Sequence, residues 1–175
     1  MRATMRGTVF FFSGMIVGAV LIFIVGAVLM PSLYAQGTLN QGVRLNHVGI
    51  SVPNFQETVN FYEKVMGFRV SHRFAPNADG RPGTAFVQIS RDTFIEIAPG
   101  MPDAKPAITH IGIGADDIKA TVAKLNERGG KATEPRRSEN SGSILANITD
   151  PAGIRTELNE QPPDSMMRKS MDSWK

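Results

Sequence analysis

Residues 45–50 read Leu-Asn-His-Val-Gly-Ile, and residues 108–113 read Ile-Thr-His-Ile-Gly-Ile. At one constant offset the two segments align without a gap, which places histidine over histidine and glycine over glycine. The same offset pairs Val59 with Val122 farther along the chain. Self-similarity at a fixed offset is the signature of a repeated structural unit. The sequence therefore predicts a duplicated domain.

Each copy is predicted to fold as a β-α-β-β-β unit. A short apolar run begins each copy as a strand, and a helix follows, with Asn54 as the N-cap of the first helix and Asp116 as that of the second. The fold class is therefore α+β, with two tandem βαβββ modules over residues 43–98 and 107–160. The three strands expected after each helix cover residues 68–74, 84–90 and 93–98 in the first module and residues 131–135, 143–149 and 155–159 in the second.

The duplication also relates two glutamates to two histidines. His47 and His110 lie on the first strands of the modules, and Glu96 and Glu157 lie on the last strands. A single histidine or glutamate in a strand is more often structural or exposed, so the argument rests on the symmetric recurrence of both. If an approximate two-fold axis relates the modules, the four side chains meet near that axis. Two imidazoles and two carboxylates form a donor set for a divalent first-row metal.

Four stretches of the chain carry a family resemblance. They are residues 45–50, residues 60–68, Phe-Ile-Glu-Ile at 94–97 and Asp-Pro-Ala-Gly-Ile-Arg-Thr-Glu-Leu at 150–158. Over residues 43–160 the sequence resembles the glyoxalase I/bleomycin-resistance group of the vicinal oxygen chelate superfamily, which also contains extradiol dioxygenases. The resemblance implies paired modules around a metal, often in a homodimer, with ligands at His47, Glu96, His110 and Glu157. It leaves the metal open among zinc, nickel, cobalt, manganese and iron.

The four-ligand set predicts proton-transfer chemistry on a small-molecule substrate. A metal with two adjacent open positions can chelate two neighbouring oxygens and stabilise the enediolate that forms when a proton leaves the adjoining carbon. The resemblance points to Glu157 as the base, with Glu96 as the other candidate. The expected activity is thus that of a lyase or isomerase of glyoxalase type.

Two other functions remain open. An extradiol-type dioxygenase uses two histidines and one carboxylate, and here Glu96 would occupy a position that dioxygen needs. A module of the bleomycin-resistance type would bind a small molecule or drug without catalysis. The site could form within one chain or across a homodimer. The third histidine, His72, is expected at the surface or at the rim of the site.

The N-terminal segment, residues 1–35, has the layout of a signal peptide or an N-terminal membrane anchor. Arg2 and Arg6 precede an uncharged apolar run from Val9 to Met30, expected as a hydrophobic helix, which is close to the roughly 20 residues that span a bilayer. Both readings predict an exported domain that is periplasmic or extracytoplasmic, and an uncleaved segment would associate it with the membrane.

Composition narrows the partners further. The chain of 175 residues has no cysteine, which excludes disulfides and thiolate metal sites. Its 19 basic and 16 acidic side chains form no basic stripe with interleaved aromatic residues, so a nucleic-acid partner is not expected. The tail, residues 161–175, begins with two prolines and is mostly polar, which predicts disorder.

Overall fold

The computed structural model describes residues 42–175 of the chain. The hydrophobic leader expected at residues 1–35 lies outside the described residues. Within residues 42–175, every helix is too short or too polar to cross a membrane. Contacts group these residues into one unit of the chain.

The first module contains one helix and four strands. Its elements are β1 (Val43–Val52), α2 (Phe55–Asn60), the π-helical turn η1 (Phe61–Val65), β2 (Arg69–Arg73), β3 (Ala85–Ser90) and β4 (Thr93–Pro99). Phe55 and Val59 are four residues apart, so they share the face of α2 that is buried. Gly67, with φ of +73°, follows the helical segment in the left-handed conformation that favours glycine.

The second module repeats this order. Its elements are β5 (Ala107–Ala115), α3 (Ile118–Glu127), β6 (Arg136–Arg137), β7 (Ile144–Thr149) and β8 (Arg155–Glu160). Ile118 and Val122 are the buried pair on α3, in the positions that Phe55 and Val59 occupy on α2. The repeat in the sequence thus corresponds to a repeat of elements.

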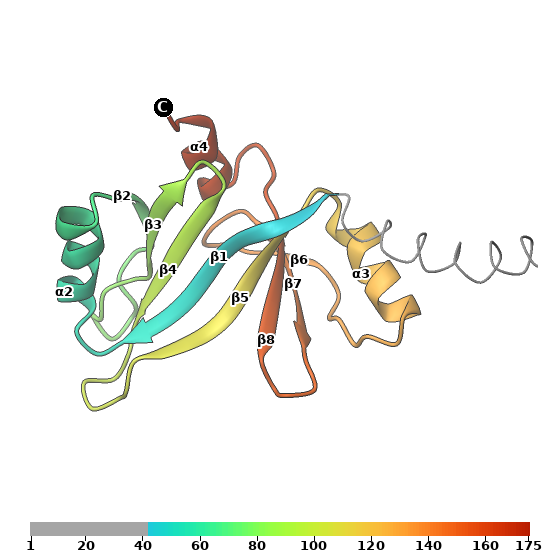
Figure 1. Cartoon of the computed structure of the whole chain (residues 1–175), viewed down its shortest axis with the longest axis horizontal. Helices are drawn as coiled ribbons and strands as arrows, with labels where there is room; N and C mark the ends of the chain where they lie inside the picture. Colours follow the sequence, from blue (N-terminus) through green and yellow to red (C-terminus); the bar gives the residue numbers. More distant parts are fainter. Residues whose placement is uncertain (1–41) are drawn as a thin grey trace, which may run out of the picture. The chain divides into compact units, whose positions relative to one another are not determined.

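All eight strands form one sheet in the order β2-β3-β4-β1-β5-β8-β7-β6 (Figure 1). The first strands of the modules, β1 and β5, are antiparallel neighbours at the middle of the sheet. Each of them is also parallel to the last strand of its own module, β4 or β8. The two modules therefore join edge to edge within one chain, and β4, β1, β5 and β8 are the four central strands.

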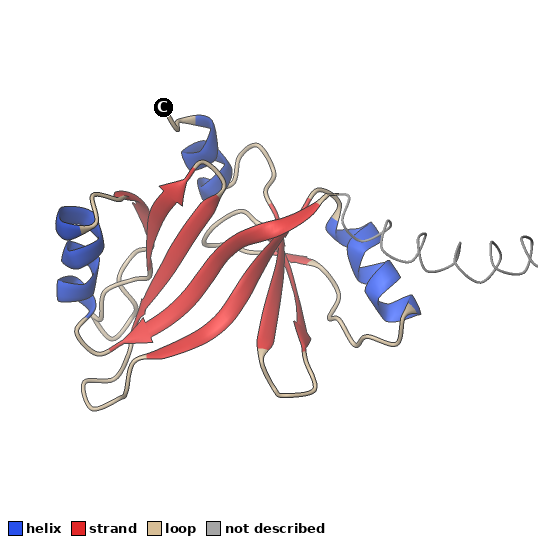
Figure 2. Ribbon diagram, viewed as in Figure 1, coloured by secondary structure: helices blue, strands red, loops and turns tan. Residues whose placement is uncertain are grey.

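Strand alternation separates the core from the site. In the first module, Val52, Val87 and Ile97 pack with α2, and in the second, Ala146 and Leu158 pack with α3. Figure 2 shows α2 and α3 beside the strands of their own modules. Because neighbouring strand residues point to opposite faces, the residues next to these core positions lie on the other face, which we call the inner face.

The C-terminal tail is ordered, so the expectation of disorder at residues 161–175 is wrong. It contains helix α4 (Met166–Asp172), in which Met167 and Met171 are buried. These methionines are four residues apart and form one apolar stripe, which the polar composition of the tail as a whole concealed. They pack against two phenylalanines of the inner face, Phe86 and Phe94.

The expected strand at residues 131–135 is also corrected. The strand of this region is β6, which begins after Pro135 and pairs with β7. Proline has no N–H to donate to a ladder, which explains the later start. Within residues 131–135, Thr133 bonds to β7: its N–H donates to the carbonyl of Asn147 at 2.8 Å, and its hydroxyl accepts from the N–H of Asn147 at 2.9 Å.

The helix caps differ from expectation as well. Asp117 caps α3, because its side chain accepts a hydrogen bond from the N–H of Ala120 at 2.9 Å. Asp116, the expected cap, instead forms an exposed ion pair with Arg44 at 2.7 Å. Asn54 precedes α2 as expected, but its side chain makes no cap bond to the described helix backbone.

Candidate metal centre

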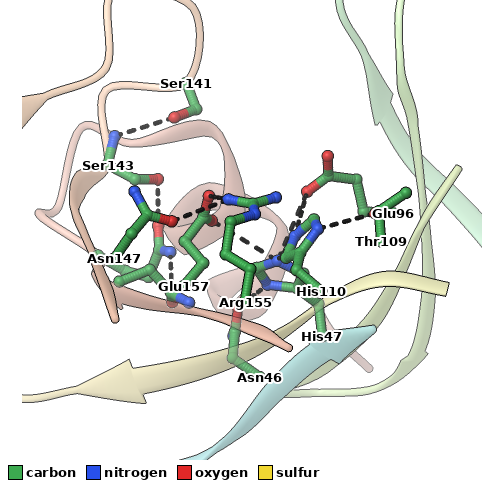
Figure 3. Close-up of polar contacts among 12 residues, drawn as sticks. Asn46, His47, Glu96, Thr109, His110, Ser141, Ser143, Asn147, Arg155 and Glu157 are labelled. Atoms are coloured by element: carbon green, nitrogen blue, oxygen red, sulfur yellow. Dashed lines mark hydrogen bonds and ion pairs between the residues drawn. The ribbon is translucent and has the colours of Figure 1, made fainter. Parts of the chain in front are cut away.

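The four residues that the sequence singled out meet on the inner face. His47 lies on β1, Glu96 on β4, His110 on β5 and Glu157 on β8, so each central strand supplies one side chain. Their potential ligand atoms all lie within 4.8 Å of one another. Figure 3 shows the four side chains pointing toward one another. The cluster forms within one chain, which answers the question that the sequence left open between one chain and two.

The distances define a compact cluster. The Nε2 atoms of His47 and His110 are 2.9 Å apart, and each lies 3.5 Å from Oε2 of Glu96. Oε1 of Glu157 lies 3.6 Å from Nε2 of His47. The histidines are buried, whereas the two carboxylates are partly exposed. The cluster is therefore open to a ligand on the side of the carboxylates.

Two glycines make room for the histidine rings. A Cβ at Gly49 would overlap the ring of His110, and a Cβ at Gly112 would overlap the ring of His47. The cross-strand register explains both contacts, because His47 lies opposite Gly112 and Gly49 lies opposite His110. The His-x-Gly pattern in each copy therefore has one structural purpose. Each module supplies a histidine, and its glycine leaves the space that the histidine ring of the other module fills.

Neighbouring polar groups orient the histidines. Nδ1 of His47 lies 2.9 Å from Oδ1 of Asn46, whose amide nitrogen donates to the carbonyl of Asp92 at 3.2 Å. Because Oδ1 can only accept, Nδ1 of His47 carries the proton, and its Nε2 presents a lone pair to the cluster. Nδ1 of His110 lies 3.0 Å from the hydroxyl of Thr109, which can donate or accept. Such outer contacts are the usual support of a metal-ligating histidine.

Burial and charge shift the titration of the cluster. Burial lowers the pKa of His47 to about 4, against the opposing effect of Glu96, so this imidazole is neutral near pH 7. Burial raises the pKa of Glu157, and the negative charge of Glu96 adds to this rise. Burial also acts to raise the pKa of Glu96, but its hydrogen bond to His110 and nearby positive charge, including that of Arg155, outweigh that effect and lower the pKa. The two carboxylates therefore differ in basicity.

Arg155 distinguishes the second carboxylate from the first. Its Nη1 lies 3.4 Å from Oε2 of Glu157 and 2.8 Å from Oδ1 of Asn147. Arg155 precedes Glu157 by two residues on β8, so both side chains leave the same face of the strand. One oxygen of Glu157 thus faces the histidines while the other faces a guanidinium. Sequence analysis assigned no role to Arg155, because surface arginines are common and nothing local marks this one.

A cavity of about 170 Å³ adjoins the cluster and includes His47, Glu96 and Glu157 in its lining. His72 was expected at the surface or the rim, and it lies in this cavity wall, with its ring stacked on Phe86 at 4.4 Å. Sequence analysis missed the remaining wall residues, because most of them lie in loops outside the motif segments. They are Phe74, Ser138, Ser141, Ser143, Leu145, Asn159, Gln161 and Met167.

The donor set fits a divalent cation. Two carboxylates on an inner face are costly to bury without a counter-charge, and together with two imidazole nitrogens their negative charges would balance a dication. His47, Glu96, His110 and Glu157 could therefore hold one divalent metal ion.

Comparison with known proteins places the chain in a family. The family model described as "Glyoxalase/Bleomycin resistance protein/Dioxygenase superfamily" matches residues 44–158. Lactoylglutathione lyase of Escherichia coli O157:H7 is 28% identical over 127 residues, which cover 68% of this chain and 93% of that protein. The same enzyme of Salmonella typhimurium is 28% identical over 126 residues, covering 67% of this chain and 93% of the relative.

A solved structure shares the fold. The crystal structure of methylmalonyl-CoA epimerase from Mycobacterium tuberculosis has a TM-score of 0.59 and 22% sequence identity, covering 73% of this chain and 92% of that one. The match to the family model spans all four residues of the cluster and both modules. The chain belongs to the Glyoxalase/Bleomycin resistance protein/Dioxygenase superfamily.

Proposed function

We propose that this protein is a metal-dependent lyase or isomerase that moves a proton on a small substrate with two neighbouring oxygens. The observation that carries the proposal is the cluster of two histidines and two glutamates beside a cavity. The curated relatives named lactoylglutathione lyase support the reaction class. The specific reaction of this chain is the part that we propose.

The chain's own residues would bind the metal and orient the substrate. His47 and His110, held by Asn46 and Thr109, would supply the two neutral ligands, and the glutamates the two anionic ones. The metal, when bound, would supply Lewis-acid stabilisation of negative charge on the substrate oxygens. The apolar and buried parts of the cavity wall would exclude water from the reacting carbon.

Glu157 is the favoured base. Glu96 contacts both histidines, so it is held on two sides of the cluster. Glu157 contacts only one of the two histidines within salt-bridge distance, and its other oxygen faces Arg155. A carboxylate with fewer contacts in the cluster can turn toward a substrate carbon more easily. Arg155 would then stabilise Glu157 as a carboxylate before it accepts the proton.

Ring cleavage with dioxygen is the weaker alternative. An extradiol-type site needs two histidines and one carboxylate, with the remaining positions free for the catechol and for oxygen. Here a second carboxylate lies within the same 4.8 Å cluster. Binding of a small molecule without catalysis is the other alternative, and it does not require that four ligand-type side chains converge.

Metal analysis tests the proposal first. The purified full chain should contain one metal ion per cluster, and His47→Ala and Glu157→Gln should both lower that content. Glu127→Gln, at the exposed end of α3, is the matched control and should leave it unchanged. Equal metal content in all four proteins would contradict the assignment of the ligands.

Deuterium exchange tests the reaction. The metal-loaded protein should exchange the proton on the carbon next to the carbonyl of α-hydroxycarbonyl compounds in D₂O. Glu157→Gln should slow this exchange more than Glu96→Gln when the rates are expressed per bound metal. Uptake of dioxygen with catechols, without proton exchange, would favour the dioxygenase instead.

A further inference from the structure

The C-terminal helix forms one wall of the cavity beside the cluster. Met167 of α4 lines the cavity and is buried against Phe86 of β3. Phe86 lies directly opposite Glu96 in the sheet, so the two side chains share the inner face. Helix α4 therefore lies across the inner face of the first module, close to the cluster. In Figure 1 it stands beside the ends of β3 and β4.

Hydrogen bonds fix helix α4 to both modules. The N–H of Met166 donates to the carbonyl of Ser141 at 2.9 Å, which fixes the start of the helix to the second module. The carbonyl of Ser170 accepts from Nη2 of Arg69 at 2.9 Å and from Nε2 of Gln88 at 3.3 Å, which fixes its middle to the first module. These contacts make α4 a fixed part of the cavity.

The cavity is small and partly open to solvent. Its volume is about 170 Å³. Cavities that take drug-sized ligands begin at about 300 Å³. A compact ligand of a few carbon atoms fits this volume, whereas a long carrier chain would not fit within it beside Met167.

Two buried polar atoms in the wall indicate the polarity of that ligand. Nδ1 of His72 faces the hydroxyls of Ser71 and Ser170, which both donate to backbone carbonyls, so Nδ1 carries the proton and Nε2 is an acceptor. Oδ1 of Asn159 accepts from Gln161 at 3.0 Å, which leaves Nδ2 as a donor. Among residues 42–175, both His72 Nε2 and Asn159 Nδ2 are buried without a hydrogen-bond partner. A ligand hydroxyl that reaches either atom would supply the missing partner.

We infer that helix α4 restricts this site to small, unconjugated, hydroxyl-bearing carbonyl compounds, and that Met167 sets the length of chain that the cavity accepts. The inference rests on the proposed function, because it takes the cluster as the place where two substrate oxygens bind. It adds a substrate class that differs from the coenzyme A conjugate in the name of the solved relative from Mycobacterium tuberculosis. The wall that enforces this class is built from the C-terminal tail of the same chain.

Binding of hydroxamates to the metal-loaded full chain tests the inference without turnover. Hydroxamates present two neighbouring oxygens to a metal, and the chain length beyond them can be varied. In an open apolar groove a longer chain would bind more tightly, because it buries more apolar surface. We expect the reverse in titration calorimetry: octanohydroxamate should bind the wild-type protein at least about tenfold more weakly than acetohydroxamate.

Two methionine variants distinguish a role of Met167 in the cavity wall from a general role in folding. Met167→Ala should remove most of this discrimination. Met171→Ala, which shortens a methionine buried in the same cluster but absent from the cavity lining, should keep it. Met167→Val is a milder second variant should Met167→Ala fold poorly, and it should weaken the discrimination in part. Equal Kd values for the two hydroxamates in the wild-type protein, or equal effects of Met167→Ala and Met171→Ala, would overturn the inference.

A second pair of probes tests the polarity. Glycolohydroxamate and propionohydroxamate have similar size and differ in a terminal hydroxyl against a methyl group. The wild-type protein should prefer glycolohydroxamate, and His72→Phe should reduce that preference while keeping the ring stacked on Phe86. A preference for the methyl compound would refute the hydroxyl-bearing class.

The outcomes for the reaction and for the substrate class are separable. If no α-hydroxycarbonyl compound exchanges deuterium but the hydroxamate preferences hold, the proposed reaction fails and the size limit imposed by α4 stands. If exchange is as fast with a glutathione hemithioacetal as with hydroxyacetone, the reaction stands and the inference about α4 fails.

Discussion

At the scale of single residues, the site depends on two glycines that leave space for the histidine rings. Gly49 and Gly112 have no Cβ, and the space this leaves is filled by the imidazole rings of His110 and His47. The spacing His-x-Gly therefore has a packing meaning that is independent of any metal. It allows two rings from antiparallel neighbours to bring their Nε2 atoms to 2.9 Å.

A glycine substitution should lower the metal content although all four ligand residues are kept. Gly49→Ala places a methyl group where the His110 ring lies, so the ring must move and metal content should fall by at least about tenfold. Gly114→Ala on the same strand pair is the control, because its Cβ would meet other atoms at an ordinary 3.5 Å. Elemental analysis checks the result, and normal metal content in Gly49→Ala would contradict the packing argument.

Buried histidines should make the metal-free protein sensitive to acid. Burial lowers the pKa of His47 and His72 from 6.5 to about 4 in the folded chain. Between these values only the unfolded chain takes up the protons, so the free energy of unfolding falls as pH decreases, by about 1.4 kcal/mol per pH unit for each histidine. Above pH 6.5 both states are neutral at these sites and their contribution is complete.

Urea unfolding of the EDTA-treated protein at several pH values measures this effect. Glu157 acts in the opposite sense, because its raised pKa stabilises the folded state on the acidic side and that gain is lost as pH rises. The informative quantity is therefore the difference between wild type and His72→Phe, which removes one histidine and keeps Glu157. The variant should lose less stability than wild type between pH 6.5 and 4, and parallel curves would contradict the pKa of His72.

At the scale of elements, local hydrogen bonds decide where each helix begins. Asp116 and Asp117 are adjacent acids before α3, and either could cap it by composition. Asp117 has the extended backbone conformation, with φ of −137° and ψ of 101°, that aims its carboxylate at the N–H of Ala120. Asp116 is turned toward Arg44 on β1 instead.

This adjacent pair gives a matched test of the cap. Asp117→Ala should lower the free energy of unfolding by about 1 kcal/mol, the usual cost of losing an N-cap. Asp116→Ala removes only an exposed ion pair and should cost less than about 0.5 kcal/mol. Denaturant unfolding of both variants checks the order, and an equal loss in the two would place the cap at neither residue alone.

At the scale of the whole molecule, the β1–β5 pairing places the complete cluster in one chain. Each module alone holds only half of the donor set, His47 with Glu96 or His110 with Glu157. The antiparallel pair β1–β5 brings the halves together, with a register that runs from Val43 opposite Ala115 to Ser51 opposite Ala107. A second chain is therefore not required to complete the donor set.

Metal content should consequently be independent of assembly. If monomer and any larger species are separated by size-exclusion chromatography, both should contain one metal ion per chain. Dilution that dissociates an assembly should leave metal bound. A ratio of one metal per two chains, or metal found only in the dimer, would show that the cluster is completed between chains.

The features that could be predicted from the sequence are those that the repeat itself encodes. The repeat predicted the two modules and, with a slightly shorter offset for the glutamates, the four converging side chains, because equivalent positions of the two copies are related by symmetry. It did not predict that each histidine ring packs on a glycine of the other module. It could not predict that residues 161–175 form α4, that β6 starts after Pro135, or that His72 and Met167 line the cavity. Those features depend on which distant surface a segment packs against. The methionines of α4 form a cavity wall only because they pack against Phe86 and Phe94, and that contact exists only after the sheet has formed.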